Sequence, residues 1–309
     1  MTTRYRLRLG TRQSPLALAQ AEEARDRLCE AHGWARDEVE LVEVVASGDK
    51  ILDRPLADIG GKALWTKELD QWLHEGRIDA SVHSMKDVET LRPADFAIGA
   101  ILPRADVRDV LVGAGSLETI PQGARVGTSA PRRAAQMLHY RPDCVIVGIR
   151  GNVATRLGKL AAGEADVTLL AAAGLERLGE ISVGTPLDEA SWLPAPSQGA
   201  IGIECRADDE FARAALEAID HAPSRARVMA ERALLEALGG TCHSPIAVLT
   251  SVTGDRLSMK ASIFSADGTE RVDGSVESES TALDAFRALG RDLLDRAPPS
   301  IAELFAPGA

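Results

Sequence analysis

The sequence predicts an α/β protein with mixed sheets covered by helices on both faces, followed by a small C-terminal α+β domain. Over the first two-thirds of the 309 residues, short apolar runs alternate with segments whose apolar residues recur at helical spacing. After Pro223 the pattern changes to a long helix, three neighbouring strand-like runs and a final helix. At roughly 150 residues per domain, a chain of this length accommodates two or three domains.

Nine short apolar runs before Pro223 have the length and the residue types of buried strands. They are Tyr5–Leu9, Glu40–Val45, Ile78–His83, Phe96–Leu102, Asp109–Val112, Ala124–Gly127, Cys144–Ile149, Asp166–Ala171 and Ala200–Glu204. Helical spacing is clearest in Pro15–His32 and Lys62–Glu75. Ser14 before Pro15 predicts a helix start, because the hydroxyl can cap the first turn and proline suits its first position. Ser129–Ala130–Pro131 predicts a second such start.

The C-terminal part follows a proline-containing stretch, Ser191–Gly199, that we expect to cross between domains. A helix is predicted at Arg225–Leu238 and another at Thr281–Leu294. Between them the sequence predicts an antiparallel meander of three strands, at Pro245–Ser251, Arg256–Ser265 and Glu270–Val276.

Composition excludes several classes of function. The formal net charge is -11 and the aromatic content is 4%, which disfavours both nucleic-acid backbone binding and base stacking. The four cysteines lie far apart without a CxxC pair, so we expect reduced thiols and no metal site. The first ten residues lack the apolar segment of a signal peptide, and no apolar run approaches the roughly 18 residues of a membrane span. We therefore expect a cytoplasmic protein without membrane or nucleic-acid partners.

Arginines recur where a predicted strand gives way to a helix. They are Arg12, Arg132, Arg133, Arg150 and Arg156. The N-terminus of a helix favours anions, and a guanidinium binds a carboxylate or phosphate through two parallel hydrogen bonds. Several such positions in an acidic chain indicate a ligand with several negative groups. The alternative is that each arginine pairs with a nearby Asp or Glu.

Seven motifs, in order along most of the chain, resemble those of the porphobilinogen deaminases, also called hydroxymethylbilane synthases. They are GTRQSPLA (10–17), VHSMKD (82–87), GTSAPRR (127–133), RGNVATRL (150–157), AGLERLG (173–179), QGAIGIECR (198–206) and GGTCHSPIA (239–247). The resemblance implies two lobes similar to type II periplasmic-binding-protein domains and a third, α+β domain. The boundaries it suggests are 1–101 with 199–221, then 102–198, then 222–309.

The resemblance also implies an activity. Members of this family condense four porphobilinogen molecules head to tail, release ammonia, and form the linear tetrapyrrole hydroxymethylbilane for haem biosynthesis. The chain grows on a dipyrromethane primer that a thioether attaches to a cysteine, here Cys242. The resemblance further suggests a monomer.

Site residues follow from the same resemblance, position by position. Asp87 resembles the catalytic carboxylate, and one carboxylate beside pyrrole N–H groups can act as acid, base and electrostatic partner. The cofactor-binding set is Cys242, Lys86, Ser84, Thr128, Ser129, Arg132, Arg133 and Arg150. The substrate-binding set is Arg12, Ser14, Arg156, Arg177, Gln198 and Lys62.

The residues taken singly leave alternatives open. Asp87 can instead cap a helix or pair with Lys86, and a single cysteine such as Cys242 is often an inert buried residue. His83 is expected to be a packed histidine at a strand end. Residues 49–64 resemble a mobile loop over the cleft, with Lys62 able to reach a carboxylate. Ser197 stands where the family usually has glycine, in the predicted crossover.

A rival hypothesis comes from another functional class. A two-lobed cytosolic protein that binds small polyanions without catalysis would need the same arginines. It would have no use for Cys242 or for the third domain. A covalent pyrrole adduct on the purified protein distinguishes the two hypotheses.

Overall fold

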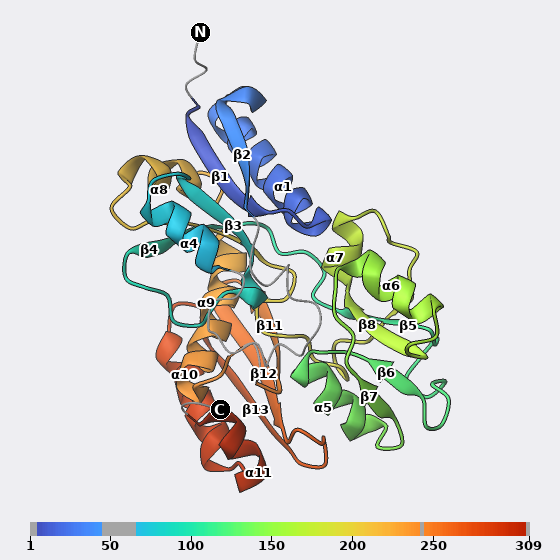
Figure 1. The fold of residues 1–309 in the computed structure, drawn as a ribbon. Helices are drawn as coiled ribbons and strands as arrows, with labels where there is room; N and C mark the ends of the chain where they lie inside the picture. Colours follow the sequence, from blue (N-terminus) through green and yellow to red (C-terminus); the bar gives the residue numbers. More distant parts are fainter. Residues whose placement is uncertain (1–4, 45–65, 242–243, 307–309) are drawn as a thin grey trace. The chain divides into compact units, whose positions relative to one another are not determined.

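The computed structural model describes residues 5–44, 66–241 and 244–306, which form two compact units (Figure 1). Within these residues, unit 1 contains 5–44, 66–105 and 199–225, and unit 2 contains 106–198, 226–241 and 244–306. The predicted division into three domains stays a prediction. None of the helices in the described residues is long and apolar enough to cross a membrane.

Unit 1 is built on a mixed five-stranded sheet in the order β2-β1-β3-β10-β4. Its strands are β1 (Leu7–Arg12), β2 (Val39–Val44), β3 (Ala80–Ser84), β4 (Phe96–Ile101) and β10 (Ile201–Arg206). Strand β1 is parallel to β2 and β3, whereas β10 is antiparallel to β3 and β4. The unit also contains α1 (Pro15–His32), η1 (Arg36–Glu38), α4 (Lys67–His74), η2 (Met85–Asp87) and α8 (Glu210–Glu217).

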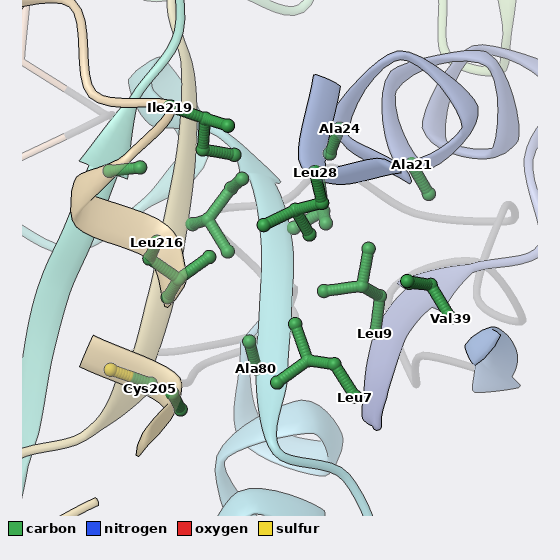
Figure 2. Packing of buried hydrophobic residues seen from close by; sticks show 14 of the residues in the cluster. Leu7, Leu9, Ala21, Ala24, Leu28, Val39, Ala80, Cys205, Leu216 and Ile219 are labelled. Carbon is green, nitrogen blue, oxygen red and sulfur yellow. The ribbon is translucent and has the colours of Figure 1, made fainter. Parts of the chain in front are cut away.

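Helices cover both faces of this sheet, as the sequence predicts. On one face, Leu7 and Leu9 of β1 pack with Leu28 of α1 in a cluster that also contains Leu216 of α8 (Figure 2). On the other face, Leu69 and Leu73 of α4 form a separate cluster with Val44 and Ile78.

Unit 2 contains a second mixed five-stranded sheet, in the order β7-β6-β8-β5-β9. Its strands are β5 (Asp109–Val112), β6 (Arg125–Gly127), β7 (Val145–Val147), β8 (Val167–Ala171) and β9 (Thr185–Pro186). Its helices are α5 (Pro131–Tyr140), α6 (Val153–Ala161) and α7 (Ala172–Arg177). Strand β6 is parallel to β7 and β8, while β5 is antiparallel to β8 and β9. The two sheets therefore share one pairing pattern.

The C-terminal residues form an antiparallel sheet in the order β11-β12-β13. Its strands are β11 (Ile246–Thr253), β12 (Arg256–Phe264) and β13 (Arg271–Glu279). The accompanying helices are α9 (Ala222–Leu238), α10 (Leu283–Asp295), α11 (Pro299–Ala302) and η3 (Glu303–Phe305). Side chains of α9, α10 and the three strands share a buried cluster that includes Leu234, Ile263 and Phe286. The predicted fold class is confirmed: two mixed α/β sheets and a small C-terminal antiparallel one.

Several element boundaries differ from the prediction. Strand β1 extends to Arg12, because Arg12 pairs with Val44 of β2 and Thr11 is fully buried. Strand β7 is limited to Val145–Val147, shorter than the predicted run. Helix α8 was not predicted; it begins where the Asp209 side chain accepts a hydrogen bond from the backbone N–H of Ala212.

The two five-stranded sheets join corresponding strands with the same ion pair. Arg8 of β1 donates its backbone N–H (2.8 Å) and its Nη2 (2.7 Å) to the carboxylate of Asp79, just before β3. Arg125 of β6 makes the same two contacts, at 2.7 and 2.8 Å, with Asp166 just before β8. Gly10 of β1 and Gly127 of β6 occupy matching positions, and each leaves room for an isoleucine side chain. A Cβ atom at Gly10 would lie 2.4 Å from Cδ1 of Ile78, and one at Gly127 would lie 2.4 Å from Cδ1 of Ile149.

Ser197 has a backbone φ of 60°. Among the described residues, no other residue apart from glycines has a positive φ. Its backbone N–H donates to the Glu231 carboxylate at 2.5 Å, so the conformation is held by a buried acceptor. The left-handed region costs a residue with a Cβ roughly 1–2 kcal/mol, a cost that glycine avoids, although glycine loses more chain entropy on folding.

We expect Ser197→Gly to raise the free energy of unfolding by about 0.5–1 kcal/mol, the relieved strain less the entropy loss. The denaturant midpoint measures this, with Ser191→Gly as a control in the same segment. An unchanged or lower midpoint for Ser197→Gly would contradict the prediction.

Candidate functional site

Two turns of unit 1 carry five of the predicted site residues. Arg12 ends β1 and Ser14 caps α1, with its Oγ accepting from the N–H of Ala17 at 3.3 Å. Ser84 ends β3, and Lys86 and Asp87 belong to the short helix η2 that follows. Because β1 and β3 are parallel neighbours, both turns lie at the same edge of the sheet. The structure thus brings the two turns to one edge of the sheet, and the roles of these residues stay a prediction.

A side chain that the sequence did not single out links helix α1 to the second of these turns. Gln20 of α1 is buried, and its Nε2 donates to Ser84 Oγ at 2.9 Å. The Ser84 hydroxyl and Gln20 Oε1 lie 3.1 Å apart, a second hydrogen bond within the same pair. Gln20 thus fixes the end of the strand from which η2 starts.

Asp87 is half-buried between the buried side chains of Met85 and Val88. Backbone hydrogen bonds hold this turn: the N–H of Met85 donates to Ala200 O at 3.0 Å, and that of Val88 to Met85 O at 3.3 Å. In the part of the chain that the structure describes, the Asp87 carboxylate forms no hydrogen bond or ion pair. Neither alternative considered for it, a helix cap or an ion pair with Lys86, is found there.

A buried charged cluster lies beside this turn. Arg92 donates to Glu204 Oε1 at 2.9 Å and to Glu89 at 2.8 Å, and it also pairs with Asp70 at 2.5 Å. His83 Nε2 lies 2.8 Å from Ser81 Oγ and 3.4 Å from Glu204 Oε2. His83 is 6% exposed, so it is packed at a strand end as the sequence predicts. The Arg92 contacts anchor the loop after Asp87 to α4 and β10.

Burial, and then the nearby Arg92 guanidinium, lower the pKa of His83 from 6.5 to about 4. Between these two values the unfolded chain binds a proton that folded His83 does not. His83 therefore does not reduce the free energy of unfolding above pH 6.5, where it is neutral in both states. As the pH falls from 6.5 toward 4, the free energy of unfolding decreases by up to about 1.4 kcal/mol per pH unit.

We expect His83→Gln, which keeps a polar side chain but cannot titrate, to lose less stability over this pH range than the parent protein. Denaturant midpoints at pH 7 and 5 measure the difference. His74→Gln, at an exposed position of α4, serves as the control. Equal losses in the parent and in His83→Gln would rule out His83 as the source.

In unit 2 the turn after β6 holds two predicted hydroxyl donors, and both form hydrogen bonds with the backbone. Thr128 Oγ1 accepts from the N–H of Ala130 at 3.1 Å, directly before α5. Ser129 Oγ donates to Ile149 O at 3.0 Å, which connects this turn to the one that precedes Arg150. These hydroxyls shape the turns between parallel strands and helices.

Three further predicted arginines lie near the same edge of the second sheet. Arg150 follows β7, Arg156 lies on α6, and Arg177 ends α7 after β8. All three are half-buried, and Arg156 Nε donates to Gly151 O at 2.9 Å. Since β6, β7 and β8 are parallel, the turns that follow them gather at one edge.

Arg132 and Arg133, in the first turn of α5, instead converge on a buried carboxylate. Asp109 is fully buried and lies 2.8 Å from Nη1 of Arg132 and 2.8 Å from Nη2 of Arg133. It also accepts from Trp192 Nε1 at 2.8 Å and from Gln198 Nε2 at 2.9 Å. Burial tends to raise the pKa of Asp109, but the two guanidiniums outweigh it and hold that pKa far below its usual range.

Two predicted site residues, Lys62 and Cys242, lie outside the described residues, as do 49–64 of the predicted loop. Thr241 and Ser244, which flank residues 242–243, are described. The N–H of Thr241 donates to Ser244 Oγ at 3.0 Å, and the N–H of Ser244 donates to Thr241 O at 3.0 Å. Thr241 is exposed and Ser244 is buried.

The family model for the porphobilinogen deaminase dipyromethane cofactor binding domain matches residues 7–214, more than half of the chain. The model of the C-terminal domain of the same family matches residues 225–297. The chain belongs to the porphobilinogen deaminase family.

Curated relatives support the same assignment. The chain is 57% identical over 306 residues to the porphobilinogen deaminase of Sphingopyxis alaskensis, covering 97% of this chain and 96% of the relative. Porphobilinogen deaminase of Paracoccus denitrificans is 47% identical, covering 94% of this chain and 92% of its own length. That of Nitrobacter winogradskyi is also 47% identical, with 96% of both chains covered.

The solved structures found by comparison include periplasmic domains. The Bordetella pertussis BvgS periplasmic VFT2 domain has a TM-score of 0.39 at 13% identity, covering 69% of this chain and 86% of that one. A Salmonella typhimurium periplasmic binding protein with high arginine specificity has a TM-score of 0.40 at 11% identity, covering 69% and 90%.

The predicted site residues were chosen by their resemblance to the porphobilinogen deaminase family. The structure shows two further residues that contact them directly, Gln20 and Asp109, and a third, Trp192, that contacts Asp109. One sequence feature pointed to Asp109: it is a charged residue at the start of an otherwise apolar strand. Nothing in the local sequence indicates Gln20 or Trp192, because their partners lie 64 and 83 residues away.

Proposed function

We propose that this chain condenses four porphobilinogen molecules head to tail into a linear tetrapyrrole, on a dipyrromethane primer attached to Cys242. The family match over residues 7–214 and 225–297 carries this proposal, because it includes both the cofactor-binding domain and the domain that bears Cys242. When bound, the dipyrromethane supplies the pyrrole carbon to which the next ring is joined.

The described residues fit such an acidic, pyrrole-containing group. Each pyrrole ring carries an acetate and a propionate, which call for several cationic partners. The arginines of unit 2 lie at or beside the carboxyl ends of parallel strands, where α/β sheets place their ligands. Nε of Arg133 is buried without a hydrogen-bond partner in the described part of the chain, as expected where a further acceptor belongs.

In the proposed mechanism Asp87 does the bond chemistry. The C–N bond of the protonated aminomethyl group of porphobilinogen breaks, neutral ammonia leaves with the electron pair of that bond, and the carboxylate of Asp87 stabilises the remaining cation through the pyrrole N–H. A carbon–carbon bond then forms, and Asp87 assists the departure of the ring proton. The place of Asp87 in η2, directly after strand β3 at the edge of the sheet where Arg12 and Ser84 also lie, supports these roles.

The remaining candidates hold the substrate. Arg12, Arg150, Arg156, Arg177, Lys86 and Lys62 would bind ring carboxylates, while Ser14, Ser84, Thr128, Ser129 and Gln198 shape or line the turns between them. Arg132 and Arg133 would contribute through the nitrogens that Asp109 does not occupy. We also propose that the protein acts as a monomer in the cytoplasm, which light scattering would test against the chain mass of 32.8 kDa.

Intact-mass spectrometry of the freshly purified protein, together with an assay of ammonia release from porphobilinogen, tests the proposal. We expect an adduct of two pyrrole units and ammonia in step with substrate loss. A bare-chain mass without ammonia release would instead favour a binding protein for small polyanions.

A further inference from the structure

The buried cluster around Asp109 has more positive than negative charge. Arg132 and Arg133 contribute two positive charges and Asp109 one negative charge, while Trp192 and Gln198 are neutral, so the cluster carries a net charge of +1. Among the described residues, Arg132 forms its ion pair with Asp109, and Arg133 is the neighbouring positive charge. A buried excess charge is costly unless a partner of opposite sign compensates it.

The contacts with Asp109 use part of each guanidinium. Arg132 contacts both Asp109 Oδ2 and Leu193 O through Nη1, at 2.8 and 3.1 Å. Arg133 contacts Asp109 Oδ1 through Nη2 and Leu169 O through Nη1, at 2.8 and 2.9 Å. A guanidinium has five N–H donors, so each arginine keeps donors beyond those that these contacts require.

The orientation of the carboxylate is itself fixed. Trp192 Nε1 donates to Oδ2 and Gln198 Nε2 to Oδ1, and both of these side chains are buried. Gln198 also donates to Val107 O at 2.7 Å, which ties the segment ahead of β5 to the same group. Three predicted ligand residues, Arg132, Arg133 and Gln198, therefore take their positions from one carboxylate.

We propose that Asp109 is a positioning residue that fixes the two guanidiniums and sets the net charge of this cluster at +1, matched to a single carboxylate of the pyrrole chain. The inference rests on the proposed function and deepens it, because it states how much negative charge of the bound pyrrole chain this cluster compensates. It requires no contact between Asp109 and the substrate.

Asp109→Asn tests this inference, because it keeps the shape of the side chain and removes its charge. We expect the arginines to lose their fixed orientation. The primer-loaded fraction should then fall, and the KM for porphobilinogen should rise at least tenfold, with kcat per primed molecule changing less than threefold. Asp109→Glu should restore part of the loss. Asp166→Asn removes the same charge from the exposed pair with Arg125 in the same unit, and it should behave like the parent.

If Asp109→Asn does not fold, Trp192→Phe replaces it, since it removes a neutral donor to the carboxylate and keeps an aromatic ring. We expect a two- to fivefold rise in KM with unchanged kcat, measured well below the unfolding temperature. A folded Asp109→Asn, or a folded Trp192→Phe, with parental primer content and KM would overturn the inference. A parent protein without adduct or ammonia release would instead reject the proposed function.

Discussion

Asp87→Asn is expected to retain the covalent primer and to lose 10²- to 10⁴-fold in kcat, the range typical for removal of a general acid–base group. The exchange keeps the size of the side chain and its place in η2, but the amide cannot take up or release the proton. Intact mass reports the primer, and steady-state ammonia release reports kcat.

Asp95→Asn is the matched control, because Asp95 is exposed on the loop that follows and contributes a backbone carbonyl, not its carboxylate, to the contact with Ala207. It should match the parent in both measurements. Substantial activity in Asp87→Asn, within a few-fold of the parent, would remove Asp87 from the catalytic role.

Cys242→Ser is expected to yield a protein of bare-chain mass with no measurable tetrapyrrole synthesis. Thioether formation needs a thiolate, and a serine hydroxyl is a far weaker nucleophile at neutral pH. The same mass measurement applied to Cys29→Ser provides the control, since Cys29 is a half-buried free thiol on α1 of unit 1. An adduct that persists in Cys242→Ser, or disappears in Cys29→Ser, would mean that another residue carries the primer.

The sequence was sufficient for the features that depend on local pattern. The Ser14 cap and the helix it starts at Pro15 are present as predicted, because both depend on neighbouring residues. Strand Asp109–Val112 has the predicted bounds, since its short apolar run is flanked by charged and small residues. Such features arise from backbone preferences that act within a few residues.

The charge partners could not be predicted in this way. For Arg132 and Arg133 the structure supports the alternative that an arginine pairs with an acidic residue of the protein, because Asp109 reaches both from β5. The groups that hold Asp109 in place are Trp192 and Gln198, which are 83 and 89 residues away in sequence. A sheet brings such positions together by strand order, and strand order is a tertiary property that no local window contains.

The strand order of unit 1 has a consequence for protein synthesis. Strand β10 lies between β3 and β4, so β4 acquires its neighbour about 100 residues after it leaves the ribosome. At a synthesis rate of roughly 5–20 residues per second, that interval lasts on the order of 5–20 s. The sheet of unit 2, whose strands all lie within residues 109–186, can be completed during the same interval. Until β10 arrives, the apolar β4 is an unpaired edge, so a nascent chain stalled before residue 201 should be the form most prone to aggregate.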